Sequence, residues 1–190
     1  MVFKLFKRSE NTIEEPAILL CSLSMHDSSC ISKDKLIYQN HRNITEYRAA
    51  SFSDFLTFLN HKTFDIVHLL TKVEPDGTIE GTSGFELFES LSNGKVKLVI
   101  FASDNPADSY LKLIPKDRSK SIKPMNIVMT LDRKGDSFQR FFQSLFDLMA
   151  QGDSMPVAWV TLVPQAPGVE HKNVPDTIFQ AGLGQIGFKP

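Results

Sequence analysis

The sequence has little of several features that mark particular classes of protein. It contains only two cysteines, Cys21 and Cys30, in 190 residues, too few for the disulfide framework of a small secreted domain. No apolar run approaches the roughly 18 to 20 residues of a membrane helix. The opening segment becomes charged before an apolar signal core could form. These absences favour a cytoplasmic protein that does not enter a membrane.

An excess of positive charge is also missing. Lys and Arg number 21 and Asp and Glu number 22, which gives a formal net charge of −1. Binding to duplex nucleic acid requires a strongly basic face, so we do not expect a nucleic-acid partner. One basic loop carries Lys116, Arg118, Lys120 and Lys123. Such a loop is typical of a solvated surface, although it could bind an anionic group. Because no aromatic residue interrupts it, single-stranded nucleic acid gains little support.

Apolar residues are abundant. Hydrophobic residues make up 42% of the chain, including 15 phenylalanines, and this content is typical of a dense aromatic core. We expect one α/β domain over residues 1–190, since this length suits a single core. Residues 1–15 are predicted to form a terminal extension. Residues 165–190, rich in proline, are predicted to form a tail that wraps the domain and ends in a short strand or closing segment.

Short apolar runs bounded by turn residues predict the strands. They occupy residues 16–23, 64–71, 95–102, 125–132 and 155–164, with a weaker run at 44–50. Continuous runs of this length suit strands that are buried on both faces. Helical patterns lie between them at 53–62, 83–94 and 136–152. The alternation predicts a mostly parallel sheet of about six strands with helices on both faces, a three-layer sandwich of the Rossmann-like kind.

Capping residues predict where these helices begin and end. Ser53 is a candidate N-cap for the first helix, and Asp136 or Ser137 for the last. Ser83 and Glu86 have the spacing of a capping box, and Gly94 can provide a left-handed exit from that helix.

In such sheets, ligands and catalytic groups gather beyond the carboxyl ends of the strands. That rule nominates residues 22–30, 71–77, 103–105 and 132–136. The two most hydrophobic strands end at Lys72 and at the run Ser103, Asp104 and Asn105. Since consecutive strands often neighbour one another, we expect Lys72 to face Ser103 and Asp104 across a crevice.

Three interpretations of this crevice stay open. Asn105 or Asp104 could cap a helix that begins at Pro106, while Lys72 forms an ion pair or points into water. Ser103 and Lys72 could form a nucleophilic pair in a hydrolase that does not use cysteine. The crevice could instead bind a small ligand.

Other motifs in the sequence give weaker indications of function. Residues 182–187, "GLGQIG", match the dinucleotide fingerprint, but only three residues follow, so no helix can present its N-terminus to a pyrophosphate. Cys21, His26 and Cys30 offer ligand types that zinc prefers, without the four-ligand spacing of a structural site. Their spacing does not fix a Cys/His nucleophilic pair either. We therefore expect no metal and no cofactor.

Three segments resemble the caspase-like cysteine peptidases, and among them the bacterial CHAT domains. They are "FDIVHLLTK", "KVKLVIFASDN" and "MNIVMTLDRKGDSFQRFFQSLFDLMAQGDSMPVAWVTL", which together span residues 64–162. That family shows a D-I-V-H strand followed by the catalytic His-Gly, a strand ending in S-A-C with the nucleophile, and then a further strand and a phenylalanine-rich helix. The resemblance implies a caspase-like fold.

The resemblance also assigns positions to individual residues. Residues 65–68 match the D-I-V-H strand, which puts His68 at the family's conserved but non-catalytic histidine. The catalytic histidine position falls on Lys72 and the following glycine on Val73, while the nucleophilic cysteine position falls on Asp104. Both catalytic residues are replaced. The resemblance thus implies a pseudopeptidase that acts as a protein-interaction or regulatory module, with Lys72 and Asp104 as a potential ion pair.

Overall fold

The computed structural model describes residues 11–23, 28–114, 122–163 and 174–189. Its centre is a six-stranded sheet in the order β3-β2-β4-β7-β8-β9. The strands are β2 (Ile18–Leu23), β3 (Ile44–Ala49), β4 (Ile66–Leu70), β7 (Leu98–Phe101), β8 (Asn126–Asp132) and β9 (Asp176–Ala181). All neighbours run parallel except β9, which is antiparallel to β8. A mostly parallel six-stranded sheet is thereby confirmed.

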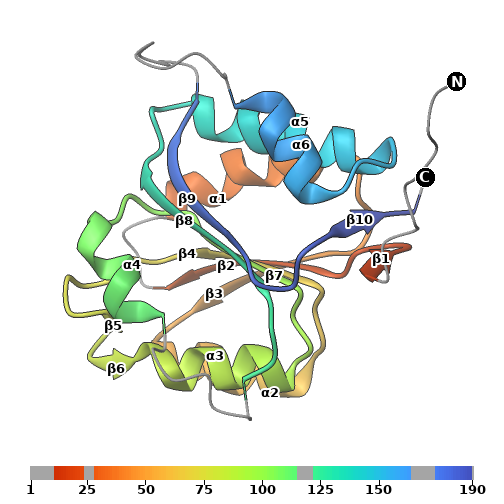
Figure 1. The fold of residues 1–190 in the computed structure, drawn as a ribbon. Coiled ribbons are helices and arrows are strands. Elements are labelled where there is room, and N and C mark those ends of the chain that lie inside the picture. Colours follow the sequence, from red (N-terminus) through yellow and green to blue (C-terminus); the bar gives the residue numbers. More distant parts are fainter. Residues whose placement is uncertain (1–10, 24–27, 115–121, 164–173, 190) are drawn as a thin grey trace, which may run out of the picture.

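Helices cover both faces of this sheet (Figure 1). One face carries α1 (Ser28–Asp34), the short 3₁₀ helix η2 (Lys35–Tyr38), α5 (Ser137–Ala150) and α6 (Met155–Leu162). The other face carries α2 (Phe52–His61), α3 (Gly84–Asn93) and α4 (Ala107–Leu113). The predicted three-layer α/β sandwich is therefore present. None of the described helices is both long and apolar enough to cross a membrane.

The central strands separate two hydrophobic cores. Every residue of β2, β4 and β7 is buried, as continuous apolar runs predict for a covered parallel sheet. Because side chains alternate along a strand, Leu20 and Ile100 pack beneath α5, whereas Leu19 and Val99 pack against α2 and α3. Phenylalanines from α5 fill much of the first core.

The predicted strand at 155–164 is wrong, because residues 155–162 form helix α6. Ser154 is at the N-cap position and Pro156 lies in the first turn, where proline is favoured. An apolar run of eight residues fits a buried strand and a buried helix equally well by periodicity. The sole tryptophan, Trp159, consequently lies on a helix, stacked on Phe179 of β9 at 4.7 Å between ring centroids.

The sixth strand of the sheet comes instead from the tail. Strand β9 lies within residues 165–190, so this segment does more than wrap the domain. The chain then forms β10 (Ile186–Phe188), which pairs in parallel with β1 (Asn11–Ile13) in a separate two-stranded sheet. Residues close to the two ends of the chain thus lie side by side (Figure 1).

Three of the expected helix ends also differ from the structure. Helix α2 is capped by Ser51, whose Oγ accepts a hydrogen bond from the Asp54 N–H at 3.1 Å, and Ser53 lies inside the helix. Helix α4 begins after Pro106, which occupies the cap position without a side-chain bond, so neither Asp104 nor Asn105 caps it. Gly94 ends α3 with φ −71°, outside the left-handed region.

A small hairpin, β5 (Thr78–Ile79) and β6 (Thr82–Ser83), follows β4. Its two-residue turn places Glu80 and Gly81 at positive φ, as a tight hairpin turn requires. The Glu80 carboxylate accepts a hydrogen bond from the N–H of Phe52 at 2.8 Å, in the first turn of α2. The hairpin therefore fastens the end of β4 to the neighbouring helix.

Candidate functional site

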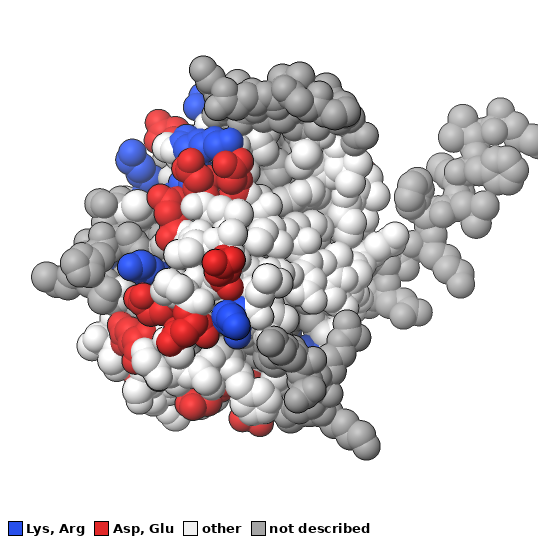
Figure 2. Space-filling model, turned by 60° about the vertical axis from the view of Figure 1, so that its left-hand side comes forward, with Lys and Arg blue, Asp and Glu red and all other residues white. Residues whose placement is uncertain are grey.

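The carboxyl ends of β4 and β7 lie next to each other, as the sequence predicts. The two strands are parallel neighbours, with Leu69 paired to Phe101. The chain leaves both strands at the end of the sheet where β5, β6 and α4 lie, on the left of Figure 1. With this end turned forward, acidic side chains are spread over the surface and basic ones are fewer (Figure 2). The positions matched to the peptidase dyad thus meet at one edge of the sheet.

Lys72 and Asp104 do not form the ion pair that the sequence suggests. Both residues are exposed. The Asp104 carboxylate accepts a hydrogen bond from the backbone N–H of Arg133, with 2.8 Å between Oδ1 and N, and the described residues include no ion pair between Asp104 and Lys72. Asp104 instead fastens the loop after β8 to the end of β7.

The buried side chain of Asn105 joins the loop after β7 to the loop after β4. Its side chain accepts a hydrogen bond from the N–H of Val73 at 2.8 Å and donates to the carbonyl oxygens of Ser103 and Thr130. Ser109 of α4 donates to the carbonyl oxygen of Val73 at 3.2 Å. The loops after β4 and β7 are thereby joined by buried hydrogen bonds. Ser103, 7% exposed, lies within this bonded region.

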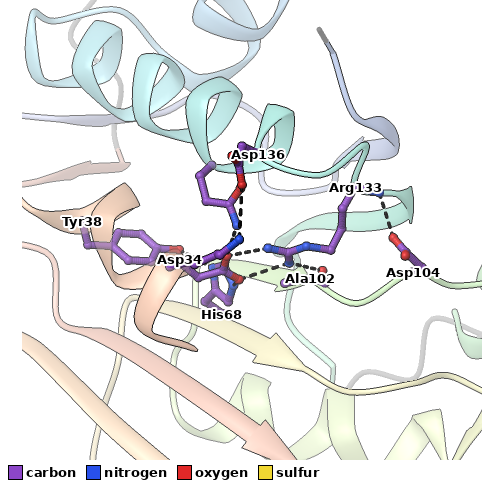
Figure 3. A network of polar contacts seen from close by, with 9 residues as sticks. Asp34, Tyr38, His68, Ala102, Asp104, Arg133 and Asp136 are labelled. Carbon is purple, nitrogen blue, oxygen red and sulfur yellow. Dashed lines mark hydrogen bonds and ion pairs between the residues drawn. The ribbon is translucent and has the colours of Figure 1, made fainter. Parts of the chain in front are cut away.

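A second cluster of charged groups lies inside the same end of the fold (Figure 3). Its centre is Asp34, which is fully buried and is the only buried carboxylate among the described residues. Arg133 donates to both carboxylate oxygens, with 3.1 Å between its Nη1 and Oδ2. Gln139 donates from Nε2 to Oδ1 at 2.8 Å, and His68 Nε2 lies 2.9 Å from Oδ2. Asp34 is therefore surrounded by donors, as a buried carboxylate must be.

His68 connects this carboxylate to Tyr38. The Tyr38 hydroxyl lies 2.8 Å from His68 Nδ1, and both side chains are fully buried. Since ionised Asp34 can only accept, His68 Nε2 donates to it, and Nδ1 shares the second hydrogen bond with the Tyr38 hydroxyl. Burial and the negative charge of Asp34 raise the pKa of Tyr38 well above its ordinary value, so the hydroxyl keeps its proton.

The electrostatics of the cluster favour ionised Asp34. Burial acts to raise the pKa of this carboxyl group, but hydrogen bonds and electrostatic attraction from His68 and then Arg133 overcome it and hold the pKa below its usual value. Asp34 and Arg133 then form a neutral pair. The chemistry available is that of a closed structural network, because its acid and base groups already bind one another.

Arg133 links the buried cluster to the exposed strand ends. Its side chain is 11% exposed and its guanidinium carbon lies 4.0 Å from the centre of the Phe138 ring. The guanidinium also donates to the Ala102 carbonyl oxygen at the end of β7, while the backbone N–H of the same residue binds Asp104 (Figure 3). Arg133 thus joins the loop after β8 to β7 and to α1.

Reasoning from the sequence missed most of this cluster. Arg133 lies within 132–136, a nominated strand end, but its partners Asp34, Tyr38 and Gln139 lie on helices. His68, which the family resemblance places at a non-catalytic position, is buried in β4. The available signal was a histidine in the middle of an otherwise apolar strand, since a buried imidazole requires partners.

The other candidate residues from the sequence do not form a site in the described part of the structure. Cys21 is a buried residue of β2, where burial raises the pKa of its thiol to about 12, and Cys30 lies in α1. His26, Lys116, Arg118 and Lys120 lie outside the described residues, whereas Lys123 is exposed. Within the described ranges, no cluster of His, Cys, Asp and Glu could hold a metal ion. The glycine-rich segment 182–187 runs directly into strand β10.

Comparisons with known proteins add no family assignment. The chain matches no protein-family model, and no curated protein is significantly similar to it.

Proposed function

We propose that this chain is a catalytically inactive caspase-like domain of the CHAT type, which acts as a protein-interaction or regulatory module. The observation that carries the proposal is the state of the two positions matched to the dyad. They lie at the ends of neighbouring parallel strands, as a dyad requires, yet they hold an exposed lysine and an aspartate that binds a backbone N–H.

The chemistry of these side chains supports the loss of peptidase activity. A cysteine peptidase needs a thiolate and an imidazole within hydrogen-bonding reach of each other. Asp104 cannot attack as a thiolate does, and its carboxylate is engaged by Arg133. The one described imidazole near this edge, His68, is fully buried and engaged on both nitrogens by Asp34 and Tyr38.

The alternative of a serine hydrolase has less support. A lysine acts as a base for serine when desolvation lowers its pKa, but Lys72 is exposed and Ser103 is buried. No described contact favours a small-ligand domain over an interaction module. On the described part of this end, acidic side chains outnumber basic ones (Figure 2), which does not favour binding to phosphate groups.

Turnover and active-site labelling test the proposal. A broad library of fluorogenic and unlabelled peptides, read by mass spectrometry, should show no cleavage above a buffer blank. A fluorophosphonate probe should leave Ser103 unlabelled between about pH 6 and pH 9. Cleavage that disappears in Asp104→Ala, or labelling of Ser103 that disappears in Lys72→Met, would overturn the proposal. Glu74→Ala, at a half-exposed carboxylate in the loop after β4, is the matched control for both assays.

A further inference from the structure

Residues 28–38, which form α1 and η2, lie across one face of the sheet and are called the strap here. The strap contributes few apolar anchors: Ile31, Ile37 and Tyr38 are its buried hydrophobic residues. Helix α1 has seven residues, too few to be stable without tertiary contacts. The helix also changes from α to 3₁₀ geometry next to Asp34. The strap therefore depends on the contacts it makes with the rest of the fold.

Much of that attachment is polar and passes through one residue of the strap. Asp34 receives the donors of Arg133, His68 and Gln139, three residues from three other parts of the chain. Tyr38 adds the bond to His68. Removing one partner of a buried ion pair leaves an uncompensated charge, which is strongly destabilising. The attachment is thus concentrated in a network that a single change can open.

The same face holds polar atoms that have no partner among the described residues. Ser22 Oγ, Thr130 Oγ1 and Gln139 Oε1 are buried and make no hydrogen bond within that part of the chain. By strand alternation, Ser22 and Thr130 point to the face that carries the strap and α5, as do Leu20 and Val128 two residues earlier. A buried polar atom without a partner destabilises the folded state, and hydrogen bonds to water would remove this cost if the atom became exposed. These atoms oppose the closed state, whereas the Asp34 network favours it.

We propose that the strap is a releasable element, held closed by the Asp34–Arg133 contact, whose opening uncovers Ser22 and the neighbouring part of this sheet face. Opening needs no unfolding of the sheet, because β2, β4 and β7 keep their own ladder and the second core. This inference goes beyond the proposed function, since it concerns how a face of the domain becomes available.

Amide hydrogen exchange of the full chain, read by mass spectrometry, tests the proposal. In Arg133→Met, amides of residues 28–38 should exchange at least tenfold faster, while those of β4 and β7 stay within about twofold of wild type. Lys35→Met is the matched control, since Lys35 lies in the strap and pairs with exposed Glu46 at the surface. It should leave strap exchange unchanged. Unchanged strap exchange in Arg133→Met, or equal acceleration in strap and strands, would refute the proposal.

A second measurement covers the case in which Arg133→Met does not fold. In the wild-type chain, exchange in low urea should show the strap opening with a weaker urea dependence than the strands. A single urea dependence shared by strap and strands would contradict a separate element. In a Ser22→Cys chain, peptide-resolved thiol labelling of position 22 should follow the strap opening rate, and labelling at the rate of global unfolding would count against the proposal. Each of these negative results would refute the releasable strap without affecting the proposal that the domain is catalytically inactive.

Discussion

Two groups of charged residues lie at the carboxyl edge of the sheet, one after β4 and β7 and the other on α1 and the loop after β8. Lys72 and Asp104 are exposed and are not paired with each other. Asp34 and Arg133 are, respectively, fully buried and 11% exposed, and they bind each other through both carboxylate oxygens. The first group occupies the positions that the sequence resemblance matches to a peptidase dyad, and the second joins α1 to the loop after β8.

The difference shows how burial decides what a charge can do. An exposed ion pair contributes little because water screens it. A buried carboxylate must be fully compensated, and its partners then become fixed in place. We therefore expect the strand ends to be tolerant of substitution and the buried cluster to be sensitive.

The largest effect is expected for Asp34→Ala. It removes the acceptor of one buried and two partly buried donors and leaves Arg133 without its carboxylate partner, so the free energy of unfolding should fall by about 3 to 5 kcal/mol. Urea unfolding followed by tryptophan fluorescence measures it. The matched control is Asp136→Ala, which breaks an exposed pair with Lys33 and should cost no more than about 1 kcal/mol. Equal losses in the two variants would show that the buried cluster is not special.

Tyr38→Phe should produce the next largest effect. The ring keeps its packing against Phe146, 5.3 Å away between centroids, but His68 Nδ1 loses its hydrogen-bond partner. A buried polar atom without a partner should lower the free energy of unfolding by about 1 to 3 kcal/mol. Tyr47→Phe is the control, because it removes the hydrogen bond from Tyr47 to Asp54 in a partly exposed setting and should cost about 0.5 kcal/mol. A loss in Tyr38→Phe no greater than in this control would contradict the assigned hydrogen bond.

Acid should remove the contribution of Asp34. Its pKa in the folded state lies below the ordinary value of 3.8, so the stability it contributes is complete above that value and is lost as the pH falls through the folded-state pKa. The difference in unfolding free energy between wild type and Asp34→Asn should therefore be constant above about pH 5 and shrink below about pH 4. Urea titrations at a series of pH values measure the difference. A difference that grows towards acid pH would contradict an ionised Asp34 in the folded protein.

A smaller effect is expected for Asp104→Ala. The variant removes the acceptor of the Arg133 N–H at an exposed position, where water can replace it, so the loss should be about 0.5 to 1 kcal/mol. Asp104→Asn keeps an acceptor oxygen and should lose less. Thermal unfolding of the two variants side by side measures the difference. An equal loss in the two variants would mean that the charge, and not the hydrogen bond, is what matters.

Much of the fold could be predicted because it depends on local patterns. Five strands and the helices at 53–62, 83–94 and 136–152 follow from apolar runs and their period. The failures have physical causes. The run at 155–164 is apolar on every side and carries no period that separates strand from helix. Strand β9 pairs only with β8 among the described strands and is partly exposed, so it lacks the continuous apolar run of the central strands.

The site was predictable only in part. The adjacency of Lys72 and Asp104 follows from strand order, but their lack of pairing depends on the loop after β8. Asp34 and Arg133 are 99 residues apart in the chain, and the sequence contains no local signal that joins them. Only His68, a polar residue within the apolar strand "IVHLL", indicated that a buried partner was needed.

Two double-mutant cycles on the free energy of unfolding test the contrast most directly. One combines Asp34→Ala with Arg133→Met, and the other combines Asp104→Ala with Lys72→Met. The buried pair should show a coupling free energy of about 2 to 3 kcal/mol, and the exposed pair should be additive to within about 0.5 kcal/mol. A coupling free energy between Lys72 and Asp104 equal to or larger than that between Asp34 and Arg133 would contradict the account. It would mean that the exposed residues at the strand ends interact as strongly as the buried pair.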